Sequence, residues 1–327
     1  MRRRDVVAFL GSAAVGLPVF ARAQQSPTLV VGVLNSAAAG PFARMIEAFR
    51  QSLANAGYVD GRNVRIDVRW ADGQYERLPQ IAADLVRGGV DVLAAPGGDV
   101  AALAAKSATS TIPIVFMVGA DPVRSGLVKS LNRPGGNATG INIFTSVLAA
   151  KRLELLRELV SQGGLIGVLV NPDNSNAESD IAELQAAGGT LNQVLHVEKA
   201  RTAEEIDHAF SGFATRKAVA LLVNTDPFYL GRRDQLAVLS LQHKLPAIYS
   251  LREHAAAGGL ISYGSNLIEG YRQIGEFVGR VLKGGKVAEM PVEQPTKFEM
   301  VINLKTAKAL GLTITPTMLA RSDEVIE

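Results

Sequence analysis

A short glycine turn, residues 94–100 with the sequence AAPGGDV, has the residue types of a backbone anion site. It follows an apolar run and precedes an alanine-rich segment, so we expect a strand, a tight turn and a helix start with free backbone N–H groups. Pro96, Gly97 and Gly98 would then contact a carboxylate or another small anion of a ligand. The turn lacks the lysine and the glycine spacing of nucleotide-binding loops. The alternative is a plain connection in which the Asp99 carboxylate caps the helix and occupies those N–H groups.

Two acids that precede a proline, Asp121 and Asp226, form a second group of candidates. Aspartate followed by proline is a common way to begin a helix, because the carboxylate caps the helix and proline fits its first position. The functional alternative is that one of these carboxylates also faces the ligand and pairs with an ammonium group. Asp226 is the stronger candidate, since the aromatic residues Phe228 and Tyr229 follow it and could cover an apolar ligand body.

Neutral polar side chains complete the candidate ligand site at the ends of other expected strands. Asparagine and serine offer both donors and acceptors, although they are also common turn formers. A tyrosine at the end of a strand could form the wall of a pocket. These further candidates are Asn35, Ser36, Asn171, Asn174, Ser175 and Tyr249.

The sequence gives little support for catalysis or for a bound metal. Its histidines are scattered, none of them pairs with another at the spacing of zinc-binding helices, and neither H-E-x-x-H nor G-x-S-x-G occurs. The lack of cysteine excludes disulfides, thiolate nucleophiles, iron–sulfur clusters and a lipid-modified N-terminal cysteine. We therefore expect no enzyme, no cofactor and no metal. A two-domain enzyme remains the alternative, with Asp121 and Asp226 facing each other as an acid and base pair.

The elements that must position these residues alternate between strands and helices. Residues 29–34 have the pattern of a buried apolar strand, residues 42–53 carry apolar side chains at helical spacing, and residues 64–70 alternate like a half-buried strand. This alternation continues and predicts an α/β fold with a mostly parallel sheet covered by helices. Ligands of such sheets bind outside the C-terminal ends of the strands, which is where the candidate residues stand.

The second half of the chain repeats the pattern of the first half. Three matches in the same order indicate two similar lobes, whose strand-end loops would face each other across a cleft. The alternative is coincidence, because buried apolar strands resemble one another. The matches join residues 166–171 with 31–35, residues 219–227 with the strand and turn of 90–99, and residues 245–249 with 112–116.

Residues 1–23 have the features of an export leader that is cleaved from the mature protein. Arginines at positions 2–4 precede a mainly apolar stretch too short to span a bilayer comfortably, and positions 21–23 fit an A-x-A processing site. The alternatives are a single membrane anchor or an ordinary first helix. Export by the general secretory route, or by the twin-arginine route whose signal Arg3 and Arg4 resemble, would bring a protein without a lipid anchor to the periplasm.

The charge balance argues against a nucleic-acid partner. The full chain has 34 basic and 31 acidic residues, but loss of the leader removes four arginines and one aspartate and leaves a formally neutral protein. A nucleic-acid surface needs a clustered excess of positive charge. With 47% hydrophobic and 20% charged residues, the chain is expected to form substantial cores, and its length favours two domains.

Four segments make the chain similar to a known family. They are residues 57–64 (GYVDGRNV), 121–123 (DPV), 132–140 (NRPGGNATG) and 301–311 (VINLKTAKALG). Together they resemble the ABC-transporter substrate-binding protein family, whose characterised members include binders of the tryptophan and tyrosine type. The resemblance implies a type I periplasmic binding fold, in which two Rossmann-like lobes with parallel sheets are joined by three hinge crossovers. It also implies that the lobes close on a small-molecule ligand, which a monomer delivers to an ABC permease at the inner membrane.

The resemblance further implies which loops bind the ligand and where the lobes divide. Ligand contacts are expected from the strand-end loops named above, including Asn174, Ser175 and Asp226. With crossovers near Asn142, Asn266 and Pro291, the N-terminal lobe would comprise residues 28–142 plus 267–290, and the C-terminal lobe residues 143–266 plus 291–327.

The chain departs from the family in the loop after the strand that ends at Tyr249. Binders of aromatic amino acids in the family tend to carry an acid there, whereas this chain has Ser250, Leu251, Arg252 and Glu253. If Leu251 takes the place of the acid, Arg252 would suit a carboxylate, and the ligand would be an aromatic or other organic acid without an ammonium group. Another alternative is the ligand-sensing core of a transcription regulator, which would need a DNA-binding helix-turn-helix at one end.

Overall fold

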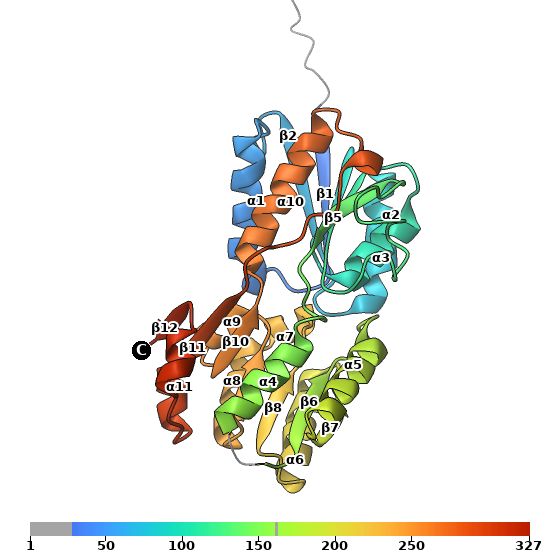
Figure 1. Cartoon of the computed structure of the whole chain (residues 1–327). Coiled ribbons are helices and arrows are strands. Elements are labelled where there is room, and N and C mark those ends of the chain that lie inside the picture. Colours follow the sequence, from blue (N-terminus) through green and yellow to red (C-terminus); the bar gives the residue numbers. More distant parts are fainter. Residues whose placement is uncertain (1–27, 161–162) are drawn as a thin grey trace, which may run out of the picture.

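The computed structural model describes residues 28–160 and 163–327, and its strands form two sheets in two lobes (Figure 1). The expected leader, residues 1–23, lies outside the described residues. The sheet of the N-terminal lobe has the order β2-β1-β3-β4-β5, and its neighbouring strands are parallel. Its strands are β1 (Leu29–Asn35), β2 (Val64–Trp70), β3 (Val92–Ala95), β4 (Ile114–Val118) and β5 (Ala138–Asn142).

The sheet of the C-terminal lobe is larger and has the order β12-β11-β10-β9-β8-β6-β7. Strand β11 runs antiparallel to β10, and the other pairs are parallel. The predicted α/β class with mostly parallel sheets is therefore confirmed. The strands are β6 (Ile166–Val170), β7 (Leu195–Lys199), β8 (Ala220–Val223), β9 (Ala247–Tyr249), β10 (Ile261–Gly264), β11 (Glu299–Asn303) and β12 (Glu324–Ile326).

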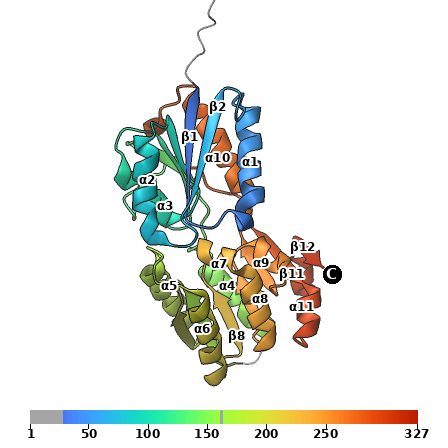
Figure 2. The same cartoon turned by 180° about the vertical axis from the view of Figure 1, so that it is seen from behind.

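Helices cover both faces of each sheet, as Figures 1 and 2 show from opposite sides. In the N-terminal lobe, α1 and α10 pack on one face and α2 and α3 on the other. The helices of this lobe are η1 (Gly40–Phe42), α1 (Ala43–Asn55), η2 (Tyr75–Arg77), α2 (Leu78–Arg87), α3 (Asp99–Ala108), α10 (Leu267–Leu282) and η3 (Val287–Glu289); those of the C-terminal lobe are α4 (Ala149–Val160), α5 (Ala177–Thr190), α6 (Ala203–Thr215), α7 (Pro227–Gly231), α8 (Arg233–Gln242), α9 (Arg252–Ala256), α11 (Leu304–Ala309) and α12 (Pro316–Ala320).

The apolar pattern of the sequence explains these layers. The predicted helix over residues 42–53 is present as α1, and its buried side chains Met45, Ile46, Phe49 and Leu53 form one stripe that faces the sheet. The same spacing that predicted the helix from the sequence thus also defines the face that it buries.

The chain passes between the lobes three times. It leaves the first sheet after β5 and enters α4, returns from β10 to α10, and crosses again between η3 and β11 (Figure 1). The two lobes that the sequence pattern predicted, and the three crossovers that the family resemblance implied, are confirmed.

Only one of the two Asp-Pro sequences begins a helix. The Asp121 carboxylate accepts hydrogen bonds from the backbone N–H groups two and three residues ahead, at 2.8 and 3.3 Å, and so stabilises a turn. The helix expected after Asp121 is absent because the chain turns at Gly126, whose φ is 77°. Asp226 does begin a helix, α7, and its carboxylate accepts from the N–H of Phe228 at 2.9 Å.

Glycines allow α10 to pack closely on α1, although these helices are far apart in the sequence. A Cβ atom on Gly275 would lie 2.7 Å from the carbonyl oxygen of Phe49, and one on Gly279 would lie 2.5 Å from the Cβ of Ala56. A side chain at either position would therefore force the helices apart.

We predict that Gly275→Ala lowers the free energy of unfolding by about 1–3 kcal/mol, because the new methyl group must displace the backbone of α1. Helix propensity alone favours alanine by about 1 kcal/mol. The control Gly189→Ala, at an exposed site in α5 with open space around it, should therefore be neutral or stabilising. Urea denaturation followed by circular dichroism measures both effects, and equal stability of the two variants would contradict the close packing of α1 and α10.

Candidate functional site

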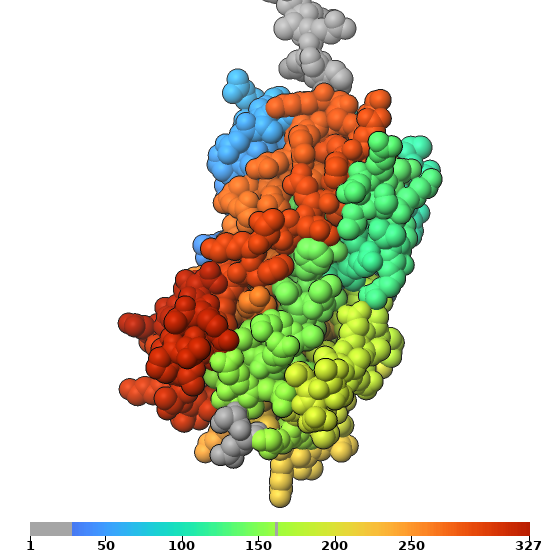
Figure 3. All heavy atoms as spheres, in the orientation of Figure 1, coloured from blue at the N-terminus to red at the C-terminus, as the bar shows by residue number. Residues whose placement is uncertain are grey.

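A cavity lies between the lobes, where the C-terminal ends of strands from both sheets meet. Its walls include Pro96 and Gly98 from the loop after β3, and Asp226 from the loop after β8. The cavity volume is about 60 Å³, which holds a few water molecules, so a larger ligand requires the lobes to move apart. On the face shown in Figure 3, the atoms of the two lobes are in contact. Arg124 of the N-terminal lobe pairs with Glu183 of the C-terminal lobe at 3.1 Å.

Apolar side chains from both lobes form much of the cavity wall. Phe42, Met117 and Leu267 come from the N-terminal lobe, and Leu230 and Leu251 come from the C-terminal lobe. All five belong to one buried apolar cluster, so apolar contacts continue from one lobe into the other. Such a wall suits a ligand with an apolar body.

Three predicted site residues of the N-terminal lobe do not line the cavity, and they support the loop that does. Asn35 donates to the Tyr271 hydroxyl at 2.7 Å, and Ser36 donates to the carbonyl oxygen of Gly97 at 2.5 Å. Gly97 has no room for a side chain, because a Cβ atom would lie 2.5 Å from the backbone nitrogen of Ser36. The structure therefore brings Asn35, Ser36 and Gly97 together as support for Pro96 and Gly98, which line the cavity itself.

Asp99 is the first residue of α3 and does not cap it. The N-cap is Gly98, whose φ of 83° favours glycine. The Asp99 carboxylate instead accepts hydrogen bonds from the backbone N–H groups of Gly119 at 3.1 Å and Ala120 at 3.3 Å, in the loop after β4. Burial raises the pKa of this carboxyl group. The capping alternative is therefore wrong, and the acid at the cavity wall makes the glycine turn a poor anion site.

Asp226 accepts hydrogen bonds from both lobes. Its Oδ1 atom accepts from the Tyr75 hydroxyl at 2.7 Å, the Asn171 amide at 3.1 Å and the Phe228 N–H at 2.9 Å, and its Oδ2 atom accepts from the Asn174 amide at 2.8 Å. Tyr75 belongs to the N-terminal lobe, so this carboxylate joins the lobes directly. Burial raises the pKa of Asp226 and raises that of Tyr75 well above its ordinary value.

The four donors leave the Asp226 carboxylate little capacity for an ammonium group, since a carboxylate offers about four acceptor positions. Its position at the cavity agrees with the sequence-based expectation, but its partners are protein groups. Sequence reasoning missed Tyr75, which carries no motif. A signal would have been a tyrosine on the first helical turn after β2, close to a strand end.

Four other predicted residues lie away from the cavity wall. Phe228 packs over Gly73, on the opposite lobe, with a ring atom 3.0 Å from where a Cβ would stand. The Tyr249 hydroxyl contacts Ser240 at 3.1 Å, and its ring stacks on His254 inside the C-terminal lobe. The remaining two, Ser175 and Asp121, are exposed in loops.

Two buried charged residues near the cavity were not among the sequence-based candidates. Arg152 in α4 is fully buried, its Nη2 atom donates to the carbonyl oxygen of Thr145 at 2.7 Å, and burial lowers its pKa to about 10. Asp180 in α5 lines the cavity and accepts from the Asn224 amide at 2.8 Å, and burial raises its pKa. The sequence could have indicated Arg152, because this charged residue lies next to Leu153 on the buried face of an amphipathic helix.

The structure contradicts the expectation that Arg252, in the loop after β9, would bind a ligand carboxylate. The Arg252 guanidinium binds both carboxylate oxygens of Glu324 in β12, at 2.5 and 2.6 Å. The neighbouring residue, Leu251, forms part of the cavity wall. Arg252 is therefore engaged elsewhere, and the case for a carboxylate ligand that rested on it is wrong.

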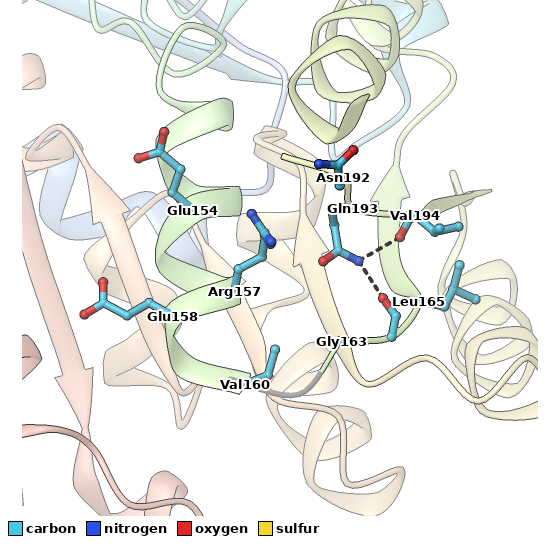
Figure 4. Close-up of a pocket in the computed structure, with 10 residues that line it drawn as sticks. Glu154, Arg157, Glu158, Val160, Gly163, Leu165, Asn192, Gln193 and Val194 are labelled. Atoms are coloured by element: carbon cyan, nitrogen blue, oxygen red, sulfur yellow. Dashed lines mark hydrogen bonds between the residues drawn. The ribbon is translucent and has the colours of Figure 1, made fainter. Parts of the chain in front are cut away.

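A separate groove of about 670 Å³ lies at the N-terminal end of β6, opposite the cleft (Figure 4). Its lining comes from the C-terminal lobe, and Gln193 donates across it to the carbonyl oxygens of Gly164 and Val194, at 2.5 and 3.0 Å.

Within residues 28–160 and 163–327, no cluster of acids and histidines is arranged to hold a metal ion. No helix in the described part of the chain is long and apolar enough to cross a membrane.

Comparison with known proteins gives consistent matches. Residues 30–326 match the family described as ABC transporter substrate binding protein. A tyrosine-binding protein of Clostridioides difficile (strain R20291) is 30% identical over 266 residues, which cover 81% of this chain and 76% of that protein. An ABC domain in complex with L-Trp from Streptococcus pneumonia has a TM-score of 0.83 at 26% identity, over 91% of this chain and 100% of the other.

A second solved structure bears on the arrangement of the lobes. The ligand-free, open structure of a substrate-binding protein with adhesive properties from Clostridium difficile has a TM-score of 0.64, at 26% identity over 91% of this chain and 99% of the other. The identity is the same as for the L-Trp complex and the coverage differs by at most one percentage point, so the lower TM-score indicates that the lobes here are arranged more as in the L-Trp complex. From its sequence match over nearly the whole length and its two-lobed structure, this chain belongs to the ABC transporter substrate-binding protein family.

Proposed function

We propose that this chain is the periplasmic receptor of an ABC importer and that its ligand is an aromatic amino acid or a close relative of one. The observation that carries the proposal is the cavity between the lobes, which combines an apolar wall with the buried carboxylates Asp99 and Asp180. The apolar wall suits an aromatic body, and the acids suit an ammonium group. The relatives named for tyrosine and L-Trp support this ligand class.

The acids favour an amino acid over an organic acid that lacks an ammonium group. Three buried carboxylates, those of Asp99, Asp180 and Asp226, line the cavity, whereas Arg252 is bound to Glu324. A ligand with only a carboxylate would add negative charge to this group, and like charges in a buried site repel strongly.

The remaining roles are part of the same proposal. Residues 1–23 direct export, without a lipid anchor, and the mature chain acts as a monomer that delivers its ligand to the permease. The lobes divide as expected from the family, at residues 28–142 plus 267–290 and residues 143–266 plus 291–327. We propose no enzymatic role: Asp121 stabilises an exposed turn and Asp226 is occupied by protein donors, which speaks against an acid and base pair.

The Tyr75 to Asp226 hydrogen bond is proposed to favour the closed arrangement. It is buried and joins the lobes, whereas the ion pair of Arg124 with Glu183 is exposed and contributes little. A ligand promotes closure only through a higher affinity for the closed form, so each contact made only in that form adds to the measured affinity.

We predict that L-tryptophan or L-tyrosine raises the melting temperature of the mature protein, because a ligand at 100 times its dissociation constant stabilises by about 2.7 kcal/mol. Differential scanning fluorimetry measures the shift, with D-allose as the unrelated control. Native mass spectrometry of the exported protein reports the leader cleavage and any retained ligand. A shift with the sugar alone would contradict the proposed ligand class, and chemical conversion of a bound ligand would contradict the receptor role.

We predict that Tyr75→Phe weakens ligand binding by about 1–3 kcal/mol, because a buried hydrogen bond from the N-terminal lobe to a charged group of the C-terminal lobe is lost from the closed form. Tyr229→Phe is the matched control: its buried hydroxyl donates to the carbonyl oxygen of Ala200 at 2.7 Å within one lobe. Tyr229→Phe should lose stability and keep its affinity for L-tryptophan in calorimetry, whereas Tyr75→Phe should lose affinity. Equal affinities would show that the contact does not act in closure.

A further inference from the structure

Asp180 carries a buried acceptor without a hydrogen-bond partner in the described part of the chain, although the nearby Ser146 hydroxyl lowers the pKa of its carboxyl group against the larger raising by burial. The residue is 3% exposed and lines the cavity, and its Oδ2 atom accepts from the Asn224 amide. Its Oδ1 atom has no partner among the residues that the structure describes, and neither has the Oδ1 atom of Asn224. A buried acceptor without a donor is costly, and more so when it belongs to a charged group. Asp180, which lines the cavity, therefore lacks a donor that a ligand would bring.

A second acid reaches the same cavity from the other lobe. The Asp99 carboxylate lies at the wall, and its backbone donors Gly119 and Ala120 are 3.1 and 3.3 Å away. The charge of Asp99 raises the pKa of Asp180, after the larger effect of burial. Closure of the lobes thus brings two like charges into one buried space, which is unfavourable unless a cation lies with them.

The surrounding protein charges do not remove this need. Asp226 adds a third buried carboxylate to the cavity wall, and Arg152 is the buried cation nearby. The charge of Asp180 raises the pKa of Arg152 against the larger lowering by burial, so the two groups attract each other. No carboxylate in the described ranges forms an ion pair with Arg152, and its Nη2 atom donates to the carbonyl oxygen of Thr145. The buried charged groups at the cavity are therefore one guanidinium and three carboxylates, so the acidic groups are in excess.

We propose that Asp180 on α5 and Asp99 on α3 form the seat of the ligand's ammonium group and that the lobes close fully only around this cation. The inference rests on the proposed function and names the group by which the same cavity selects its ligand. An ammonium group has three N–H donors, and the unpaired Oδ1 atom of Asp180 at the cavity wall is an acceptor for one of them. Asp226, whose oxygens already accept four protein donors, joins the lobes instead.

Calorimetry with three related ligands tests the seat. L-tryptophan has both charged groups, tryptamine lacks the carboxylate, and indole-3-propionate lacks the amine. We expect the wild-type protein to bind indole-3-propionate at least about 10-fold more weakly than L-tryptophan. Asp180→Asn should weaken L-tryptophan and tryptamine binding by about 10- to 100-fold and should leave indole-3-propionate nearly unchanged, because the lost interaction is with the amine alone.

Glu178→Gln is the matched control. It removes one negative charge from the same helix, but its side chain is exposed and pairs with Lys199 outside the cavity, so affinity should not change. Asp180→Asn should also keep or raise the melting temperature of the ligand-free protein, because it relieves repulsion with Asp99. A purely structural Asp180 would instead give a lower melting temperature together with an equal loss of affinity for all three ligands, and this result would overturn the inference.

Other outcomes separate this inference from the proposed function. If L-tryptophan binds the wild-type protein and Asp180→Asn equally well, the ammonium seat is wrong and the receptor function stands. If neither L-tryptophan nor L-tyrosine binds the wild-type protein, the proposed ligand class is wrong. In that case a thermal shift with the diamine putrescine, lost in Asp180→Asn, would support the seat, and no response to any amine would overturn it.

Discussion

The contact between the Tyr75 hydroxyl and the Asp226 carboxylate, 2.7 Å across the two lobes, organises the rest of the cleft. The same carboxylate caps α7 and accepts from the amides of Asn171 and Asn174. One buried acid therefore fixes a helix start, a loop of its own lobe and a residue of the opposite lobe. Because these donors satisfy its oxygens, the charge of Asp226 is tolerated although the side chain is buried.

The topology of the sheets explains why so many polar groups meet here. In parallel sheets the loops at the C-terminal strand ends share one edge, and the two lobes place these edges opposite each other. The loops after β3, β4 and β8 supply or hold Asp99 and Asp226, while α5 begins shortly after β6 and carries Asp180. Parts of the chain that are distant in sequence thus form one small cavity.

The lobes and most strands could be predicted from the sequence because their signal is local. A buried strand such as β6 or a stripe such as that of α1 depends on the spacing of nearby apolar residues. The site was predictable only in part. The turn with Pro96 and Gly98 and the acid Asp226 stand next to strand ends, so the sheet rule located them. Tyr75 and Asp180 sit on helices, and their roles depend on which residue of the other lobe they face, which no local pattern encodes.

The loop after β9 carries an apolar residue where the family resemblance implies an acid. In this chain Leu251 lies there and extends the apolar wall beside Phe42. Asp180 reaches the same cavity from α5, with an oxygen left free. A cavity that closes around its ligand needs the compensating charge inside it, but the element that supplies the charge is free to differ, since Coulomb attraction depends on distance and burial and has little dependence on direction. The loss of an acid at one position of the wall is therefore no evidence that the ligand lacks an amine, provided that another element restores the charge.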